Sequence, residues 1–309
     1  MYEETRSNGV RVHKYGPHIF HTNDKEVFTY LQQFTSFYFY EHRVIGYIDE
    51  KFVPIPFNFK SLELLFSSDK VKKIKEKLLS KYKDQKKVSI LDLLNDEDKV
   101  IKSFGEYVYE KVFVNYTAKQ WNVPISEVDT SVINRVPVLL GYDDRYFTDT
   151  YQAMPKNGFN EIFENMLDNK NIDVKLNTNA KDLLTIDTDN KKIYYDNKEF
   201  KGIVIYSGAI DEFLDYKYGP LPYRSLDLVF EDRSENYYQP TSVVNYTVSE
   251  KFTRITEFKY LSNQIVKDNT TILKEYPLTY DYKNKNHVPY YAIFNDKNIS
   301  LYNKYYNSI

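Results

Sequence analysis

The sequence predicts a mixed α/β fold, because strand-like and helix-like patterns occupy different stretches of the chain. Apolar and polar residues alternate in residues 10–15 and again in residues 38–57. Apolar residues then recur at helical spacing between residues 61 and 114, and short strand-like runs return after residue 170. A period of two is typical of strands, and recurrence every three or four residues is typical of helices.

The opening stretch is expected to hold a strand over residues 10–15, then a loop and a helix. Asn23, followed three residues later by Glu26, predicts a capping box at the start of that helix. The helix then carries Val27, Leu31 and Phe34 on one side.

Residues 38–57 are expected to form two strands joined at Asp49-Glu50-Lys51. Helices follow between residues 61 and 114, where two apolar stripes predict buried faces. The stripes are Val71, Ile74, Leu78 and Tyr82, then Ile101, Phe104, Val108 and Val112.

In the second half, strands are expected around one helix that follows Asn157-Gly158. The predicted strands are Tyr142–Phe147, Ile172–Leu176, Lys192–Tyr195 and Gly202–Tyr206. The last run ends at Ser207-Gly208, which is typical of a central parallel strand whose carboxyl end faces a cofactor. Beyond Leu226, segments such as Ser242–Val248 and Thr270–Lys274 indicate an antiparallel sheet.

The composition excludes several classes of function. The chain has 309 residues, with 42 basic and 44 acidic side chains and a formal charge of −2, so it offers no broad field for nucleic acid or an anionic membrane. No apolar run approaches the roughly 20 residues needed to span a bilayer. The absence of cysteine excludes disulfides and fits a reducing compartment. We therefore expect a soluble cytoplasmic protein.

The histidines do not predict a metal site. Four of the five, His13, His18, His21 and His42, fall in the first 42 residues. The chain has no cysteine, no His-x-x-x-His helix and no carboxylate at ligand spacing near them, so we predict no bound metal.

Residues 115–147 combine the residue types that hold a nucleoside diphosphate. Tyr116 and Trp121 can stack on a uracil or a sugar ring, and Arg135 can bind phosphate oxygens through paired hydrogen bonds. Tyr146 completes the set. In a chain with 31 tyrosines, an aromatic residue near an arginine is more often part of the core or its rim, so the spacing alone favours ordinary packing.

A wider pattern of motifs resembles the UDP-galactopyranose mutase family. The blocks occur in the family's order and cover nearly the whole chain. They include His13-Lys-Tyr-Gly-Pro-His18-Ile-Phe-His21-Thr-Asn, Ile55-Pro-Phe-Asn58, Asn115-Tyr-Thr-Ala-Lys-Gln-Trp-Asn122, Asp144-Arg-Tyr-Phe-Thr-Asp149, Tyr206-Ser-Gly-Ala-Ile-Asp211, Thr253-Arg-Ile255, Lys274-Glu-Tyr-Pro277 and Pro289-Tyr-Tyr291.

The resemblance implies a partial FAD/NAD-binding Rossmann-like domain with an inserted helical domain and an antiparallel β-sheet domain. The FAD-binding part would comprise residues 1–37 and 151–220. The helical substrate or lid domain would comprise residues 60–140. The sheet domain would comprise residues 38–59, 141–150 and 221–309.

The resemblance also implies an isomerase. In the family, N5 of reduced FAD attacks the anomeric carbon of UDP-galactopyranose and displaces UDP, and the sugar recloses as the furanose. The cofactor supplies this chemistry, and the protein supplies position and charge. The implied partners are UDP-galactopyranose, UDP-galactofuranose and a second copy of the chain in a homodimer.

Residue by residue, the resemblance assigns Arg135 and Arg254 to the diphosphate and His18 to a loop that approaches the flavin ring. These three would be the catalytic residues. The substrate contacts implied are Tyr116, Gln120, Trp121, Arg135, Tyr146, Arg254, Tyr290, Tyr291 and, beside the sugar, His42. The remaining flavin contacts implied are Ser207, Gly208 and Arg224.

The chain departs from the family pattern in two flavin-binding segments. None of its nine glycines forms the G-x-G-x-x-G turn that lets backbone amides approach a pyrophosphate. We therefore expect a truncated mutase, without the N-terminal Gly-rich unit and the C-terminal flavin segment, that binds FAD weakly or not at all. The alternatives are a noncatalytic fragment that binds UDP or UDP-sugar, and another FAD-dependent enzyme of the amine-oxidase type.

Overall fold

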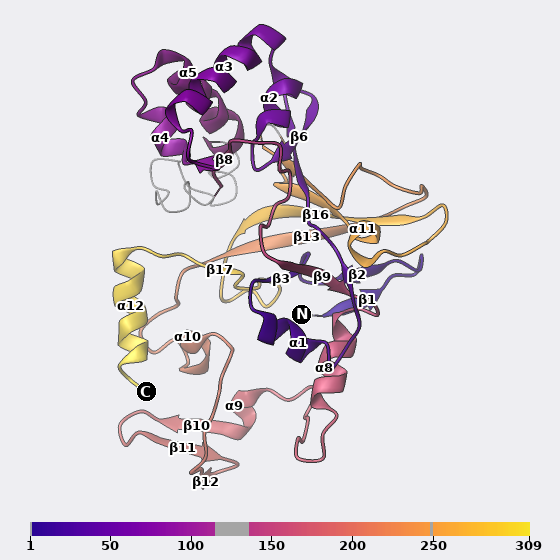
Figure 1. The fold of residues 1–309 in the computed structure, drawn as a ribbon. Helices are drawn as coiled ribbons and strands as arrows, with labels where there is room; N and C mark the ends of the chain where they lie inside the picture. The colour runs from indigo at the N-terminus through magenta and orange to yellow at the C-terminus, as the bar shows by residue number, and fades with distance from the viewer. Residues whose placement is uncertain (1, 115–135, 248–249) are drawn as a thin grey trace. The chain divides into compact units, whose positions relative to one another are not determined.

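The computed structural model describes residues 2–114, 136–247 and 250–309. It confirms a mixed α/β fold with several sheets (Figure 1). The chain divides into two compact units, which are described separately. Unit 1 comprises Met1–Asp168 and Asp227–Pro277, and unit 2 comprises Asn169–Leu226 and Leu278–Ile309. The three-part domain division inferred from the sequence stays a prediction.

The main sheet of unit 1 is built around strand β15. At one edge lies β17 (Tyr291–Ala292, a part of unit 2). The strands that follow it are, in order, β13 (Tyr223–Arg233, which begins in unit 2), β16 (Thr270–Thr279), β15 (Arg254–Glu257), β14 (Val243–Tyr246), β5 (Val44–Ile48) and β6 (Lys51–Ile55). Strand β14 pairs antiparallel with β15, as expected, but parallel with β5. The antiparallel sheet predicted from the sequence is therefore confirmed for β14–β15–β16, and it continues through a parallel pair.

The predicted hairpin around residue 50 is confirmed. Strands β5 and β6 are joined by Asp49 and Glu50, which both have positive φ. That backbone matches the right-handed twist of the two strands.

Smaller sheets and short helices complete unit 1. Strands β1 (Glu3–Thr5) and β2 (Arg11–His13) form a hairpin, and β9 (Tyr151–Pro155) lies between β3 (Phe20–Thr22) and β4 (Phe37–Phe39). The helices of this part are α1 (Lys25–Leu31), α8 (Phe159–Leu167) and α11 (Phe258–Ser262).

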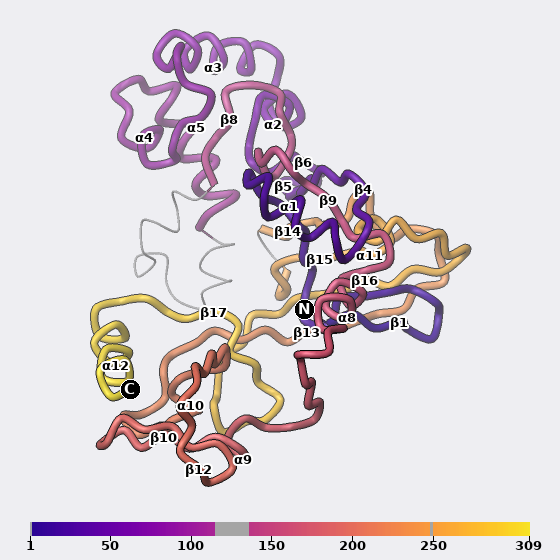
Figure 2. The backbone as a smooth tube through the Cα atoms, turned by 60° about the horizontal axis from the view of Figure 1, so that its bottom comes forward, coloured from indigo at the N-terminus to yellow at the C-terminus, as the bar shows by residue number. Residues whose placement is uncertain are grey.

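The helices predicted between residues 61 and 114 are confirmed, and they gather in one group of unit 1 (Figures 1 and 2). They are α2 (Phe59–Leu65), α3 (Ser68–Lys81), α4 (Ile90–Leu94), α5 (Lys99–Val108) and a π-helix at Tyr109–Val114, with the strand pair β7 (Lys87–Val88) and β8 (Val138–Leu139) beside them.

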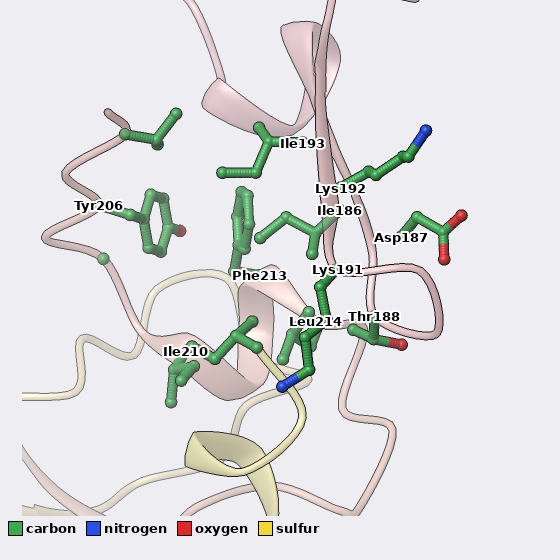
Figure 3. A pocket seen from close by; sticks show the side chains of 13 residues that line it. Ile186, Asp187, Thr188, Lys191, Lys192, Ile193, Tyr206, Ile210, Phe213 and Leu214 are labelled. Atoms are coloured by element: carbon green, nitrogen blue, oxygen red, sulfur yellow. The ribbon is translucent and has the colours of Figure 1, made fainter. Parts of the chain in front are cut away.

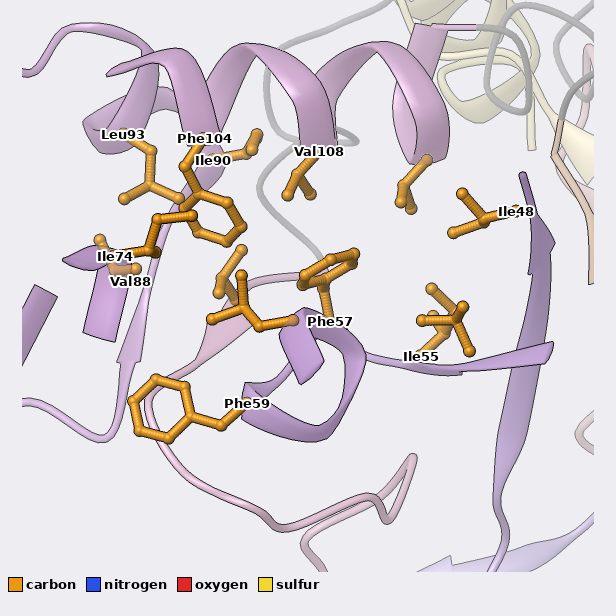
Figure 4. Close-up of a cluster of buried hydrophobic side chains, with 14 of the residues drawn as sticks. Ile48, Ile55, Phe57, Phe59, Ile74, Val88, Ile90, Leu93, Phe104 and Val108 are labelled. Carbon is orange, nitrogen blue, oxygen red and sulfur yellow. The ribbon is translucent and has the colours of Figure 1, made fainter. Parts of the chain in front are cut away.

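Both apolar stripes lie in the core of this group. Ile74 and Leu78 of α3 are buried together with Phe104 and Val108 of α5. Figure 4 shows Phe104 and Val108 pointing from α5 toward Phe57, and the ring centres of Phe57 and Phe104 are 5.8 Å apart. Burial of these faces provides most of the stability of such helices, since short helices are marginal alone.

Unit 2 contains a three-stranded meander of β10 (Leu184–Asp187), β11 (Lys192–Tyr195) and β12 (Lys198–Glu199). Its helices are α9 (Ala180–Leu183), α10 (Ile210–Phe213) and α12 (Asp296–Tyr306), and β17 (Tyr291–Ala292) pairs with the first residues of β13. Tyr305 of α12 is fully buried, where its hydroxyl accepts from the Tyr218 amide and donates to the Gly219 carbonyl.

Three predicted strands are wrong. Tyr142–Phe147 is an irregular segment in which the side chain of Asp143 accepts from both the backbone and the guanidinium of Arg145, so local polar contacts replace a strand ladder. Ile172–Leu176 is exposed and irregular.

Gly202–Tyr206, expected to be a buried parallel strand, is also irregular. Ile203 is 89% exposed and Ile205 is 91% exposed. Within the described ranges, no strand pairs with this segment, and a lone extended run gains neither ladder hydrogen bonds nor burial.

The helix start near residue 24 is shifted by one residue. Asp24, not Asn23, caps α1, and its side chain accepts from the amides of Glu26 and Val27. Asn23 instead bonds the side chain of Asp149 and the amide of Thr150. The capping box is therefore absent, and Phe34 lies beyond the end of the helix.

Candidate functional site

Arg254 lies in a row of residues that crosses four strands of unit 1. It is opposite Asn245 of β14 on one side and Glu275 of β16 on the other, and Asn245 is in turn opposite Gly46 of β5. Residues directly opposite in a sheet project from the same face. The register therefore places Arg254 between an amide and a carboxylate.

Glu275 holds the guanidinium of Arg254. The Nε of Arg254 donates to Oε1 of Glu275 over 2.6 Å, and the carboxylate is only 3% exposed. A buried carboxylate is stable only when it is paired, and a charged hydrogen bond restricts how a guanidinium can turn. Arg254 is therefore a cation held in one orientation.

A pocket of about 260 Å³ opens beside this row. Its walls come from β14 and β15, from the loop before β3, from the start of β5 and from the segment after residue 141. The residues that line it are Pro17, His18, Ile19, His42, Val44, Tyr146, Phe147, Val243, Asn245 and Arg254. Four residues predicted from the sequence, His18, His42, Tyr146 and Arg254, thus meet in one pocket.

His42 is a neutral imidazole inside this pocket. It is 4% exposed, and burial, with Arg254 and His21 as further causes, lowers its pKa to about 4. Its ring lies against Phe147 and meets the edge of Tyr146, whose amide donates to the His42 carbonyl. The Nδ1 atom is buried with no hydrogen-bond partner in the described part of the chain. It can therefore bond a ligand group.

His18 is positioned by its own loop. Its amide donates to Nδ1 of His13 over 3.0 Å, and its Nδ1 lies 2.9 Å from the carbonyl of Gly16. A carbonyl only accepts, so Nδ1 of His18 carries the proton and Nε2 is left to accept. Burial, with the nearby charge of Arg254 as a further cause, lowers the pKa of His18, which favours this neutral form.

No sequence pattern predicted a role for Asn245 or Glu275. Glu275 lies inside the family motif Lys274-Glu-Tyr-Pro277, but its pairing with Arg254 depends on the β15–β16 register. Asn245 carried no sequence signal. Its Oδ1 is buried without a partner among the described residues, and buried acceptors normally have one.

Four predicted substrate contacts lie outside the described residues. They are Tyr116, Gln120, Trp121 and Arg135. Their roles stay predictions.

The other predicted contacts belong to unit 2. Arg224 and Tyr291 are opposite each other on β13 and β17, with the guanidinium carbon 4.9 Å from the ring centre, and the amide of Tyr290 donates to the Arg224 carbonyl. Ser207 is exposed, and Gly208 lines two mainly apolar pockets of about 350 and 610 Å³. Figure 3 shows Ile186, Ile193, Tyr206 and Phe213 facing the smaller pocket.

The described residues of unit 2 do not fit a dinucleotide such as FAD. The required cradle is a strand, a Gly-rich turn and the N-terminus of a helix. Here Ser207 and Gly208 follow an exposed, irregular segment and precede α10, which has four residues.

Comparisons with known proteins agree with the motifs. Residues 111–309 match the sequence profile of UDP-galactopyranose mutase. The "dTDP-fucopyranose mutase" of Escherichia coli is 30% identical over 98% of this chain and 77% of the relative. The "Probable UDP-galactopyranose mutase" of Klebsiella pneumoniae is 33% identical over 96% of this chain and 72% of the relative. The "UDP-galactopyranose mutase" of Mycoplasma genitalium is 32% identical over 95% and 73%.

The fold agrees as well. A crystal structure of reduced UDP-galactopyranose mutase matches with a TM-score of 0.59 at 14% identity, over 90% of this chain and 66% of that chain. The fold, the motifs and the relatives place the chain among the sugar-nucleotide mutases, which are isomerases. The chain belongs to the UDP-galactopyranose mutase family, whose members depend on a flavin.

Proposed function

We propose that this chain binds UDP-galactopyranose and UDP-galactofuranose and takes part in their interconversion, with the sugar and diphosphate in the pocket of Arg254. The observation that carries the proposal is the convergence of Arg254, Tyr146, His42 and His18, from distant parts of the sequence, on one pocket of unit 1.

The charges of the pocket suit a diphosphate leaving group. Breaking the bond between the anomeric carbon and UDP increases negative charge on the diphosphate. A cation that is already oriented stabilises that charge more than it stabilises the bound substrate. Arg254, held by Glu275, meets this requirement, and in our proposal Arg135 is the second cation.

The neutral groups suit the sugar. His42 and Asn245 each have a buried atom without a partner among the described residues, and a hexose carries several hydroxyl groups that can donate or accept. We assign Tyr146 to a phosphate oxygen. We assign the uridine to Tyr116, Gln120 and Trp121, and further phosphate contacts to Tyr290 and Tyr291.

UDP binding by the Arg254→Ala variant tests this proposal. Loss of a hydrogen bond to a charged group removes about 1.5 to 3 kcal/mol, so the Kd for UDP in isothermal titration calorimetry should rise about 10- to 100-fold. Arg43→Ala is the matched control, because Arg43 is an exposed arginine that pairs with Glu41 and Asp144 outside the pocket. An unchanged Kd for Arg254→Ala, or an equal effect of both variants, would remove Arg254 from the site.

A second function is binding of the nucleotide sugar without turnover. The irregular, exposed state of Gly202–Tyr206 beside Ser207 and Gly208 favours it, because this segment does not present a flavin cradle. Incubation with UDP-galactofuranose, FAD and dithionite decides between the two. Formation of UDP-galactopyranose supports the mutase, and its absence in a sample that binds UDP supports the binding protein.

The identity of the nucleotide sugar has its own test, since one relative is named for dTDP-fucopyranose. We expect UDP-galactopyranose to displace a bound fluorescent UDP at lower concentration than dTDP-fucopyranose does. The reverse order would assign the chain to the second substrate.

We also propose that the chain forms a homodimer and acts in the cytoplasm. Sedimentation velocity would measure the oligomeric state. Among the described residues, no helix has the length and apolar character that crossing a membrane requires.

A further inference from the structure

Glu3 is a buried carboxylate that links three segments of unit 1. It is 5% exposed. One carboxylate oxygen accepts from the amide of Phe159 over 2.7 Å, at the first turn of α8, and the other lies 3.2 Å from Nε2 of His13. Its backbone is also fixed, because its amide donates to the side chain of Asn160 and its carbonyl accepts from that side chain.

The glycine before α8 makes room for this carboxylate. Gly158 has a φ of +95°, and a Cβ at this position would lie 2.2 Å from Oε2 of Glu3. Both the backbone conformation and the contact exclude any larger residue. The chain around residue 158 is thus shaped to admit the carboxylate of Glu3.

The hydrogen bonds of His13 set its tautomer. The side chain is buried, with Phe159 and Phe258 against its ring. Nδ1 accepts from the amide of His18, so that nitrogen carries no proton. Nε2 therefore carries the proton and donates to Glu3. A carboxylate that fixes the proton on the far nitrogen of an imidazole is a common way to orient it.

The chain of contacts ends at the pocket. The amide that His13 accepts from belongs to His18, and His18 lines the pocket with His42 and Arg254. Gly16, which precedes His18 in the same loop, has a φ of +91° and accepts from Nδ1 of His18. His18 is thus held at two points. Its amide donates to the side chain of His13, which is paired with Glu3, and its Nδ1 donates to the carbonyl of Gly16.

We propose that Glu3 and His13 form a positioning dyad that anchors the backbone of the His18 loop, so that His18 keeps its proton on Nδ1 and presents Nε2 as an acceptor at the Arg254 pocket. Neither residue of the dyad lines the pocket. Both act through His18, and their relevance to the sugar nucleotide rests on the function proposed above.

A purely stabilising network is the competing explanation. Such a network would tolerate either tautomer of His13 and of His18, provided that the chain stays folded. The dyad, in contrast, requires one tautomer of His13 and one of His18. Imidazole tautomers have distinct nitrogen chemical shifts, so NMR of the full chain with ¹⁵N-labelled histidine distinguishes the two explanations without substrate or cofactor.

The first measurement is on the unmodified protein, with His13 and His18 assigned through His13→Gln and His18→Gln. We expect the proton on Nε2 in His13 and on Nδ1 in His18. The opposite tautomer in either residue, or rapid averaging of both, would overturn the proposal. This result needs no further variant.

The second measurement is on Glu3→Gln, which keeps the shape of the side chain but replaces one acceptor with an NH₂ donor. The new NH₂ group must face either the amide of Phe159 or Nε2 of His13, and both are donors. If His13 moved its proton to Nδ1 in order to accept from the NH₂ group, that proton would face the amide of His18, which is also a donor. We expect the amide signal of His18 to shift and its Nδ1–H signal to be lost or averaged. Glu4→Gln is the matched control, because Glu4 is the next residue on β1 and pairs at the surface with Lys14.

If Glu3→Gln leaves both His18 signals where Glu4→Gln leaves them, Glu3 has no positioning role. Addition of UDP-galactopyranose separates this proposal from the proposed function. If the predicted tautomers are present and the sugar nucleotide moves no His18 signal, the dyad is supported and the proposed function fails.

Discussion

His42 illustrates how burial decides the charge of a single residue. An imidazole taken out of water and placed near a guanidinium loses more as a cation than as a neutral ring. The fold keeps this residue neutral, so that Arg254 and the proposed Arg135 provide the positive charge of the pocket. A neutral ring can bond a sugar hydroxyl without repelling Arg254.

His42 also makes stability depend on pH. Its pKa falls from an ordinary 6.5 to about 4 in the folded protein, so between these values the unfolded chain binds a proton that the folded chain does not. Stability due to this group is therefore complete above pH 6.5 and decreases as the pH falls toward 4. Over that range the loss is about 3 kcal/mol.

We expect the free energy of unfolding of His42→Asn, measured in urea, to decrease less between pH 6.5 and pH 4 than that of the unmodified protein. His287→Asn is the control, because His287 lies in a surface loop. A curve for His42→Asn that is parallel to that of the unmodified protein would show that His42 does not titrate as described.

Lys259 is a second residue whose contacts determine its role. Its side chain is nearly buried, and its ammonium donates to the carbonyls of Asn236, Val266 and Asn269 over 2.5 to 2.9 Å. It also lies 4.6 Å from the ring centre of Tyr237. One cation thus ties three backbone segments together.

Lys259→Met keeps the length of the side chain and removes the donor. Three backbone carbonyls would lose a charged donor, and we expect a loss of about 2 to 3 kcal/mol in the free energy of unfolding, measured in urea. Lys267→Met, at an exposed position between Val266 and Asn269, should change stability by less than about 0.5 kcal/mol. Equal effects would contradict this role.

At the scale of elements, the packing of α4 against α5 depends on a missing side chain. Gly105 lies in the middle of α5, where alanine is usually preferred by about 1 kcal/mol. A Cβ at Gly105 would lie 2.7 Å from Cβ and 2.9 Å from the backbone carbon of Leu93. The close contact between the two helices therefore outweighs helix propensity.

We expect Gly105→Ala to destabilise the protein by about 1 to 3 kcal/mol, as overpacking does. Thermal denaturation followed by circular dichroism at 222 nm measures the shift in Tm. Gly141→Ala is the control, since a Cβ there meets nothing within 4 Å. A rise in Tm for Gly105→Ala would show that helix propensity decides instead.

At the scale of the whole molecule, the two units differ in how well they bury their apolar side chains. Both clusters of buried hydrophobic residues found in the described part of the chain belong to unit 1, which also holds the Arg254 pocket. Unit 2 exposes Ile203 and Ile205 almost fully. The Arg254 pocket therefore lies in the unit that holds the packed hydrophobic core.

The sequence also predicts a low affinity for FAD. We expect the purified chain, mixed with FAD and desalted, to retain far less than one equivalent, because no Gly-rich turn presents backbone amides to a pyrophosphate. Absorbance at the flavin band measures the retained cofactor, with a flavoprotein that carries G-x-G-x-x-G as the positive control. A stoichiometric yellow complex would contradict this expectation and favour the mutase over the binding protein.

Local patterns were sufficient for the helices and the central hairpin. The stripes through Ile74 and Phe104 predicted buried faces because helical spacing alone determines which side chains share a face. Asp49 and Glu50 predicted a turn because they are polar residues between two short stretches with strand-like patterns. The motifs from His13 to Tyr291 predicted the family. The family resemblance then assigned His18, His42, Tyr146 and Arg254 to the substrate or cofactor site.

Long-range contacts decided the rest. Gly202–Tyr206 has the apolar run typical of a strand, and Tyr142–Phe147 was predicted to be one as well, but a strand forms only where a neighbour supplies hydrogen bonds and cover. The pairing of Arg254 with Glu275, and its place beside Asn245, follow from a register among three strands. The amino-acid sequence by itself thus determined the family, the helical faces and the candidate cations. Only the tertiary structure decided which carboxylate orients Arg254 and which imidazole stays neutral, because charge and orientation depend on neighbours that are distant in the chain.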